Sequence, residues 1–243
     1  MTVKNIIFLV SLFSFQLICA QDLNQIGVFP TIDHSGTLTD KLEYSLYYFG
    51  AFNIKNTAIN GSLPPANLSF VYAEQALTYS LNSNLSFTGS YVFEKVNPTK
   101  DNFRNENRFY LQMGYQYNLN RTTLKHRLRF DGRFIQDRVT GDRPFTSRLR
   151  YKIGLETPLQ KNNKVYLSLY NEFFFNLDKS AIAIYGEDWA YAALGFKIDK
   201  NNKIEAGALS IFGVYNKQND FNRSYYLQLT WINHVDFRAT KKI

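Results

Sequence analysis

The chain has 243 residues, of which 28 are Lys or Arg and 20 are Asp or Glu, so its formal charge at pH 7 is +8. A single cysteine excludes internal disulfides and cysteine-rich metal centres as sources of stability. The length suits one β domain, and aromatic residues reach 16% of the sequence. Nucleic acid is not an expected partner despite the basic balance, because the first residues predict export.

Residues 1–20 form a predicted targeting segment. Lys4 supplies a positive start, residues 6–15 an apolar stretch, and Ala20 a small residue at the expected cleavage point. The apolar stretch is short for a membrane-spanning helix. Cys19 lacks the small preceding residue that a lipoprotein site needs. We therefore expect a cleaved signal peptide and an exported mature chain without cysteine.

Residues 21–40 allow several interpretations. Pro30 would interrupt a central ladder, and residues 33–36 (Asp-His-Ser-Gly) have the composition of a turn. Three possibilities stay open for this N-terminal segment: a periplasmic hairpin, a plug in a lumen, or an additional strand of the same sheet.

From residue 41 onward the sequence predicts β-strands, because apolar and polar residues alternate as successive side chains of a strand do. The expected strands are 41–53, 68–79, 85–93, 108–117, 124–136, 145–156, 165–176, 188–198, 204–215 and 223–237. Their connections are alternately short and long, as in transmembrane β-barrels with tight periplasmic turns and longer outer loops. We expect an all-β, antiparallel transmembrane barrel over residues 41–243, with about ten strands and up to 12. Ten strands would leave both ends of the barrel on the periplasmic side.

The most regular alternation is in the hairpin of residues 124–156, around a loop at residues 137–144. One face is apolar and the other is rich in arginine. The candidate lumen-lining residues are Lys125, Arg127, Arg129, Asp131, Arg133, Arg148, Arg150, Lys152 and Glu156 of this hairpin, with Glu172 from the next strand. Symmetric closure of the loop would set Asp131 opposite Arg150 and Arg129 opposite Lys152. Like charges directly opposite each other need acids from neighbouring strands, water or an anionic ligand.

Parity alone does not tell which face points inward. In a soluble barrel the apolar face fills the interior, whereas in a membrane barrel it meets lipid and the charged face lines the lumen. The predicted export, the rhythm of the connections and the aromatic residues near strand ends favour a barrel in the outer membrane.

Residues 126–134 (HRLRFDGRF), 147–159 (SRLRYKIGLETPL), 171–177 (NEFFFNL) and 77–93 (LTYSLNSNLSFTGSYVF) resemble an uncharacterised family of Gram-negative outer-membrane barrels, catalogued as a domain of unknown function. The resemblance implies an outer-membrane barrel and brings no catalytic residues with it. The motifs are patterns of Arg-x-Arg, Tyr and Gly rather than an active-site signature.

Catalytic and cofactor signatures are weak. Asp33, His34 and Ser35 include the residue types of a hydrolase triad, but neighbours in one turn cannot easily form the relay. The three histidines are too scattered to suggest a metal site, and there is no Gly-rich phosphate loop before a helix. We expect no metal and no cofactor.

The sequence thus predicts a small, non-enzymatic outer-membrane barrel with an arginine-rich lumen, acting as a narrow anion-preferring pore or as a structural or binding barrel. Its expected partners are outer-membrane lipid and small anions. Two alternatives stay open: a lipid-modifying hydrolase of the outer membrane, which would involve His34 and His234, and a soluble periplasmic carrier barrel.

Overall fold

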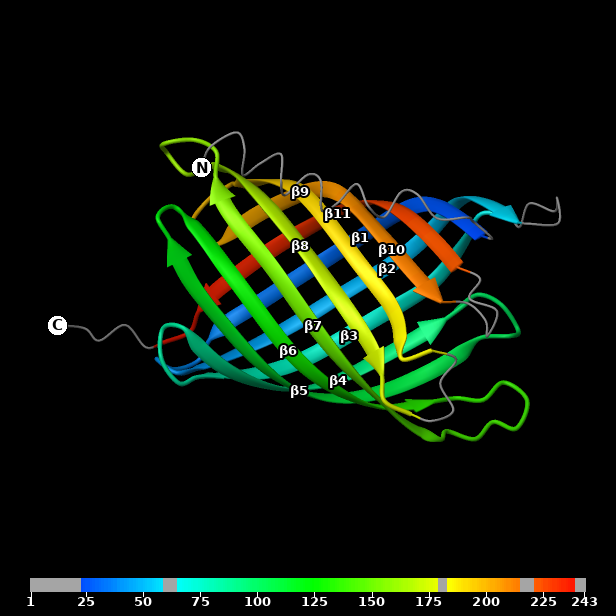
Figure 1. Cartoon of the computed structure of the whole chain (residues 1–243). Coiled ribbons are helices and arrows are strands. Elements are labelled where there is room, and N and C mark those ends of the chain that lie inside the picture. Colours follow the sequence, from blue (N-terminus) through cyan, green and yellow to red (C-terminus); the bar gives the residue numbers. More distant parts are fainter. Residues whose placement is uncertain (1–22, 59–64, 179–182, 215–220, 239–243) are drawn as a thin grey trace.

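A closed barrel of eleven strands makes up the described part of the computed structural model, residues 23–58, 65–178, 183–214 and 221–238 (Figure 1). The predicted signal peptide, residues 1–20, lies outside the described residues. The strands are β1 (Leu23–Thr37), β2 (Leu42–Ala58), β3 (Asn67–Ser80), β4 (Leu85–Val96), β5 (Arg104–Leu119), β6 (Thr122–Ile135), β7 (Phe145–Pro158), β8 (Val165–Asn176), β9 (Tyr185–Lys197), β10 (Asn202–Val214) and β11 (Phe221–Asp236). The predicted all-β barrel is confirmed.

The N-terminal segment forms β1, which is the additional strand among the three possibilities left open. It closes the barrel by pairing antiparallel with β2 and parallel with β11, whereas all other neighbours are antiparallel. Pro30 has no ladder partner on β2, consistent with its missing N–H, yet the strand continues on both sides of it. The expectation that both ends of the barrel lie on one side is therefore wrong: β1 begins at the end of the barrel opposite to the end where β11 finishes (Figure 1).

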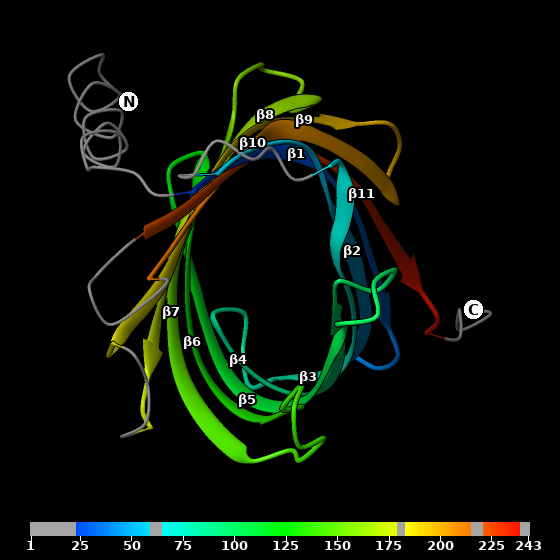
Figure 2. The ribbon, with the colours of Figure 1, turned by 90° about the vertical axis from the view of Figure 1, so that its right-hand side faces the viewer.

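The connections divide into two sets, one at each end of the barrel. The turn end holds the links 38–41, 81–84, 120–121, 159–164 and 198–201, and the loop end holds the links 59–66, 97–103, 136–144, 177–184 and 215–220. At the tightest turn Asn120 has a positive φ of 56°, which the two-residue hairpin geometry requires. Seen along its length, the ribbon encloses an oval cross-section (Figure 2).

The two faces of the wall differ in chemistry, as alternation demands. The outer face carries large apolar side chains that remain exposed, including Leu111, Leu128, Leu194 and Leu227. The inner face carries most of the buried charged residues together with one compact group of rings. The barrel is thus apolar outside and largely polar inside, which is the reverse of a water-soluble protein.

The register of the β6–β7 hairpin differs from the predicted one by two residues. Asp131 pairs with Arg148 rather than Arg150, and Arg129 pairs with Arg150 rather than Lys152. The cause lies in the loop, where the backbone N–H of Asp137 donates to the carbonyl of Asp142 at 2.7 Å, so that Asp137 meets Asp142 instead of Pro144. Gly141 has a φ of +80° inside this turn, a conformation that glycine adopts without steric cost.

A cluster of rings forms the inner side of the wall made by β1, β2 and β9–β11. The rings of Phe29 and Phe49 stack at 4.7 Å between centroids, and Trp189 meets them edge-on at 6.0 and 6.3 Å. Leu209 and Tyr226 are buried behind them. Because β2 and β9 are separated by three strands in the barrel, these rings reach across the lumen and narrow it. We call this cluster the aromatic wall.

Candidate functional site

The lumen contains a cavity of about 1170 Å³ that extends over most of the barrel length. Its lining includes Ser83 and Asn84 at the turn end and Asn97 and Arg104 at the loop end. This cavity is the candidate functional site, because it brings together many of the charged side chains of the described chain.

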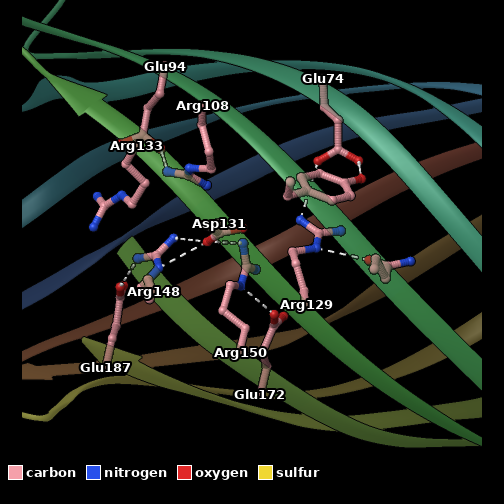
Figure 3. Close-up of polar contacts among 12 residues, drawn as sticks. Glu74, Glu94, Arg108, Arg129, Asp131, Arg133, Arg148, Arg150, Glu172 and Glu187 are labelled. Atoms are coloured by element: carbon pink, nitrogen blue, oxygen red, sulfur yellow. Dashed lines mark hydrogen bonds and ion pairs between the residues drawn. The ribbon is translucent and has the colours of Figure 1, made fainter. Parts of the chain in front are cut away.

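The residues predicted from the hairpin pattern lie on the inner face. Nine of the ten line the cavity: Lys125, Arg127, Arg129, Arg133, Arg148, Arg150, Lys152, Glu156 and Glu172. The tenth, Asp131, is fully buried beneath Arg148. Together with Glu74 on β3, Glu94 on β4, and Glu106 and Arg108 on β5, they form a group of charged residues on β3–β8, which we call the charged wall. Figure 3 shows part of this wall, from Glu74 and Glu94 to Glu172.

At the loop end, the charged wall is built around Glu106. One of its carboxylate oxygens accepts from the Nε atoms of Arg108 and Arg133, both at 2.8 Å, and the other accepts from Arg133 at 2.7 Å. Arg108 also reaches Glu94 at 3.2 Å. Because Glu106 and Arg108 are almost completely buried, each needs the other to avoid an uncompensated charge.

In the middle of the barrel, two acids serve the arginines of β6 and β7. Asp131 accepts from Arg148 at 3.0 Å and lies 3.8 Å from Arg150. Glu172 on β8 accepts from Arg150 at 2.6 Å and from Arg127 at 2.5 Å through the same oxygen. These acids relieve the repulsion that the directly opposed cations would otherwise suffer.

Glu74 on β3 organises the third part of the charged wall. It accepts hydrogen bonds from the phenol groups of Tyr72 and Tyr110 and lies 3.5 Å from a guanidinium nitrogen of Arg129. The same guanidinium stacks 3.6 Å from the centre of the Tyr110 ring and donates to Gln112. Arg129 therefore contacts Glu74, Tyr110 and Gln112 at once, and these contacts fix its position in the wall.

The sequence-based prediction omits Glu74, Glu94, Glu106 and Arg108. Glu94 and Glu106 fall in the stretch that the prediction assigns to a long loop, but the structure extends β4 and β5 to include them. The available signal was the shared parity of Arg104, Glu106 and Arg108 with the inward residues further along β5.

The charges that face the cavity are nearly balanced. Its lining has ten basic side chains, Arg104, Arg108, Lys125, Arg127, Arg129, Arg133, Arg148, Arg150, Lys152 and Lys203. It has eight acidic ones, Asp33, Glu43, Glu74, Glu94, Glu156, Glu172, Glu187 and Glu205. Asp131 and Glu106 lie behind this lining, so the surface that a solute meets is slightly positive, whereas the lining and these two buried acids together carry no net charge.

Asp33, His34 and Ser35 do not form a triad, since His34 points to the outer face and bonds Asn233 and Tyr44. Ser35 instead contacts Nδ1 of His234 at 2.8 Å. The carboxylate of Glu43 approaches that same Nδ1, at 3.8 Å, and Thr37 occupies the other ring nitrogen. A relay needs the acid and the nucleophile on opposite ring nitrogens, so the Ser35–His234 contact lacks that arrangement.

Within the described residues no group of three or more His, Cys, Asp and Glu side chains is placed to hold a metal ion. The same residues contain no helix that is long and apolar enough to cross a membrane.

Comparison with known proteins gives one family and one solved structure. Residues 28–238 match the family described as "Protein of unknown function (DUF2490)", which confirms the resemblance to a domain of unknown function. A structure described as "NanC porin structure in rhombohedral crystal form" is similar with a TM-score of 0.43 and 11% identity, over 82% of this chain and 95% of that chain. No curated protein matches the chain.

Proposed function

We propose that this chain, which belongs to the DUF2490 family of proteins of unknown function, forms a narrow pore for small solutes in the outer membrane, with a modest preference for anions. The observation that carries the proposal is the cavity that follows the lumen inside an outwardly apolar barrel.

The outer surface supports a membrane location. Every strand except β8 presents at least one large apolar side chain that is more than a third exposed, up to 72% at Leu111. Aromatic side chains lie near both ends of this band, for example Tyr79 and Trp231 toward the turn end and Phe52 and Phe93 toward the loop end. Apolar bands bordered by aromatic residues are typical of lipid-facing barrels. A soluble periplasmic carrier would leave this surface in water, where it would aggregate.

The interior supports passage of small solutes rather than a wide channel. The aromatic wall reduces the bore from one side, and the charged wall fills the other with paired side chains. A slightly positive lining within a low-dielectric wall concentrates anions over cations, but the many acids keep this preference small.

Reconstitution into planar bilayers tests the proposal. We expect small unitary currents and a reversal potential in a KCl gradient that favours chloride slightly over potassium. Lys125, whose side chain is 52% exposed at the turn end of the lumen, offers a mild change: Lys125→Glu should shift the reversal potential toward potassium.

Lys161→Glu is the matched control, because it makes the same charge change in an exposed link outside the lumen. It should leave the reversal potential unchanged. Folded protein that carries no current would refute the pore and support a purely structural or binding barrel. Recovery of the native protein in the soluble periplasmic fraction would refute the membrane location.

A further inference from the structure

Lys152 is a cation without an acidic partner. It lies on β7 and faces the cavity, and among the described residues it makes no hydrogen bond and no ion pair. Its ammonium nitrogen sits 3.4 Å from the centre of the Tyr170 ring. A ring face attracts and positions a cation, but it does not neutralise the charge.

The neighbours of Lys152 increase the local positive charge. Arg127 lies directly opposite on β6, and Glu172 lies directly opposite on β8. Glu172, however, already accepts from both Arg127 and Arg150 through one oxygen. Glu172 is therefore already shared between two arginines, and the buried Nε–H of Arg127 has no acceptor among the described residues.

Opposed like charges in a sheet are destabilising unless something compensates them. Elsewhere in the charged wall the compensation comes from the protein, as when Glu106 serves Arg108 and Arg133. Arg127 is paired with Glu172, but Lys152 beside it has no ion pair among the described residues, so an anion in the cavity that both side chains line can supply the missing compensation.

We propose that Lys152 and Arg127 form a binding site within the lumen for the carboxylate or phosphate group of a small anion. Ammonium and guanidinium donors recognise such oxyanions through short, charge-assisted hydrogen bonds. This deepens the proposed function, on which it rests for the route by which a solute reaches the site. The solute would pause at Lys152 on its way through the lumen.

Asp33 limits the charge that the site accepts. It faces the same cavity from β1 and, among the described residues, makes no hydrogen bond and no ion pair. A second negative group inside the same low-dielectric space opposes the entry of highly charged anions. Asp33→Asn should therefore strengthen anion binding, whereas loss of Lys152 should weaken it.

The test measures the thermal midpoint of the full-length protein in detergent as acetate or inorganic phosphate replaces chloride at constant ionic strength. A ligand that binds only the folded state raises this midpoint in a saturable way. We expect saturation for at least one of the two oxyanions. Loss of one charge-assisted hydrogen bond in Lys152→Gln should raise the half-saturating concentration roughly tenfold or more.

Lys161→Gln is the matched control, because it removes the same charge from an exposed link outside the lumen. It should leave the half-saturating concentration unchanged, and Lys152→Arg should largely retain binding. If Lys152→Gln does not fold, the result for Asp33→Asn decides whether the site exists, because this variant should lower the half-saturating concentration. Equal binding by the wild type and Lys152→Gln, or weaker binding by Asp33→Asn, would overturn the site.

The two proposals fail in different ways. A saturable rise in the thermal midpoint without any bilayer current would retain the anion site and refute the pore. Current without such a rise, for either oxyanion, would retain the pore and refute the site. Acetate and phosphate act as separate arms, and the one with the lower half-saturating concentration identifies the preferred group.

Discussion

The two walls of the lumen are held in place by different forces. The aromatic wall packs rings against apolar residues such as Leu209, and its geometry follows from volume and contact. The charged wall also packs cations on rings, such as Arg129 on Tyr110, but its geometry follows mainly from which acid reaches which arginine. We therefore expect the aromatic wall to set the width of the lumen and the charged wall to set the electrostatic potential within it.

This difference predicts how each wall responds to change. A smaller apolar side chain in the aromatic wall should lower the stability only by the contacts it loses and by the cavity that its neighbours do not refill. A network of buried charges responds more steeply, because removal of one member leaves the others uncompensated. The pairs themselves need not add net stability, so the network is better understood as fixing one arrangement of the side chains.

The largest expected effect comes from breaking the charged wall at its centre. Asp131 is completely buried and is the nearest acid to Arg148. Asp131→Ala should lower the free energy of unfolding by about 3–5 kcal/mol, since it strands a buried guanidinium. Glu156→Ala breaks an exposed pair with Lys125 on the same wall and should cost roughly 0–1 kcal/mol. Urea unfolding in lipid vesicles measures both, and similar losses would mean that burial does not govern this wall.

The next effect concerns the outer face of the barrel, where a charged substitution should lower the stability equally behind the charged wall and behind the aromatic wall. Leu128 on β6 and Leu227 on β11 both expose apolar side chains on the outer face. Arg at either position should cost about 2–4 kcal/mol if it lies near the middle of the bilayer. Comparable losses of unfolding free energy at the two sites, in the same assay, would show that the two walls differ only on the side that faces the lumen. A negligible loss at both sites would contradict the membrane location.

A smaller effect on stability, with a clear effect on function, is expected in the aromatic wall. Phe49 lines the cavity and stacks on Tyr72 with the ring centres 4.2 Å apart. Phe49→Leu keeps the site apolar but removes volume and ring stacking, so it should lower the free energy of unfolding by about 1–2 kcal/mol. It should raise the single-channel conductance by widening the lumen, without moving the reversal potential. A shifted reversal potential with unchanged conductance would show that the aromatic wall does not set the bore.

Alternation was sufficient to predict most of the barrel from the sequence. The run from Leu124 to Glu156 places arginine on one parity and apolar residues on the other, and the structure keeps that division. The strand that contains Pro30 was harder to predict, because its parallel partner lies about 200 residues away in the chain. Local patterns carry no information about such a pairing.

The pairing of charges could be predicted less well than the faces. In the loop Asp137 meets Asp142 instead of Pro144, and this shift of two residues changes the partner of Asp131 from Arg150 to Arg148. The contact between Glu74 and Arg129 joins β3 to β6 across two intervening strands, so no hairpin pattern contains it. Parity identifies the residues of a lumen, whereas register and barrel closure decide which of them meet.

The smallest expected effect lies outside both walls and provides a baseline for the acid sensitivity of the charged wall. Asp199, in the turn between β9 and β10, accepts from the side-chain amide of Asn202 and from the backbone N–H of Asn201 at 2.7 Å, which lowers the pKa of its carboxyl. A lowered pKa in the folded state stabilises the protein above the unfolded value, and this contribution is lost as the pH falls through the folded value. Asp199→Asn should therefore melt slightly below the wild type near about pH 7, and the gap should close toward about pH 3. The acid-induced loss that both proteins share then belongs to other carboxylates, among them the buried acids of the charged wall. A gap that stays constant with pH would mean that the charge of Asp199 does not stabilise this turn.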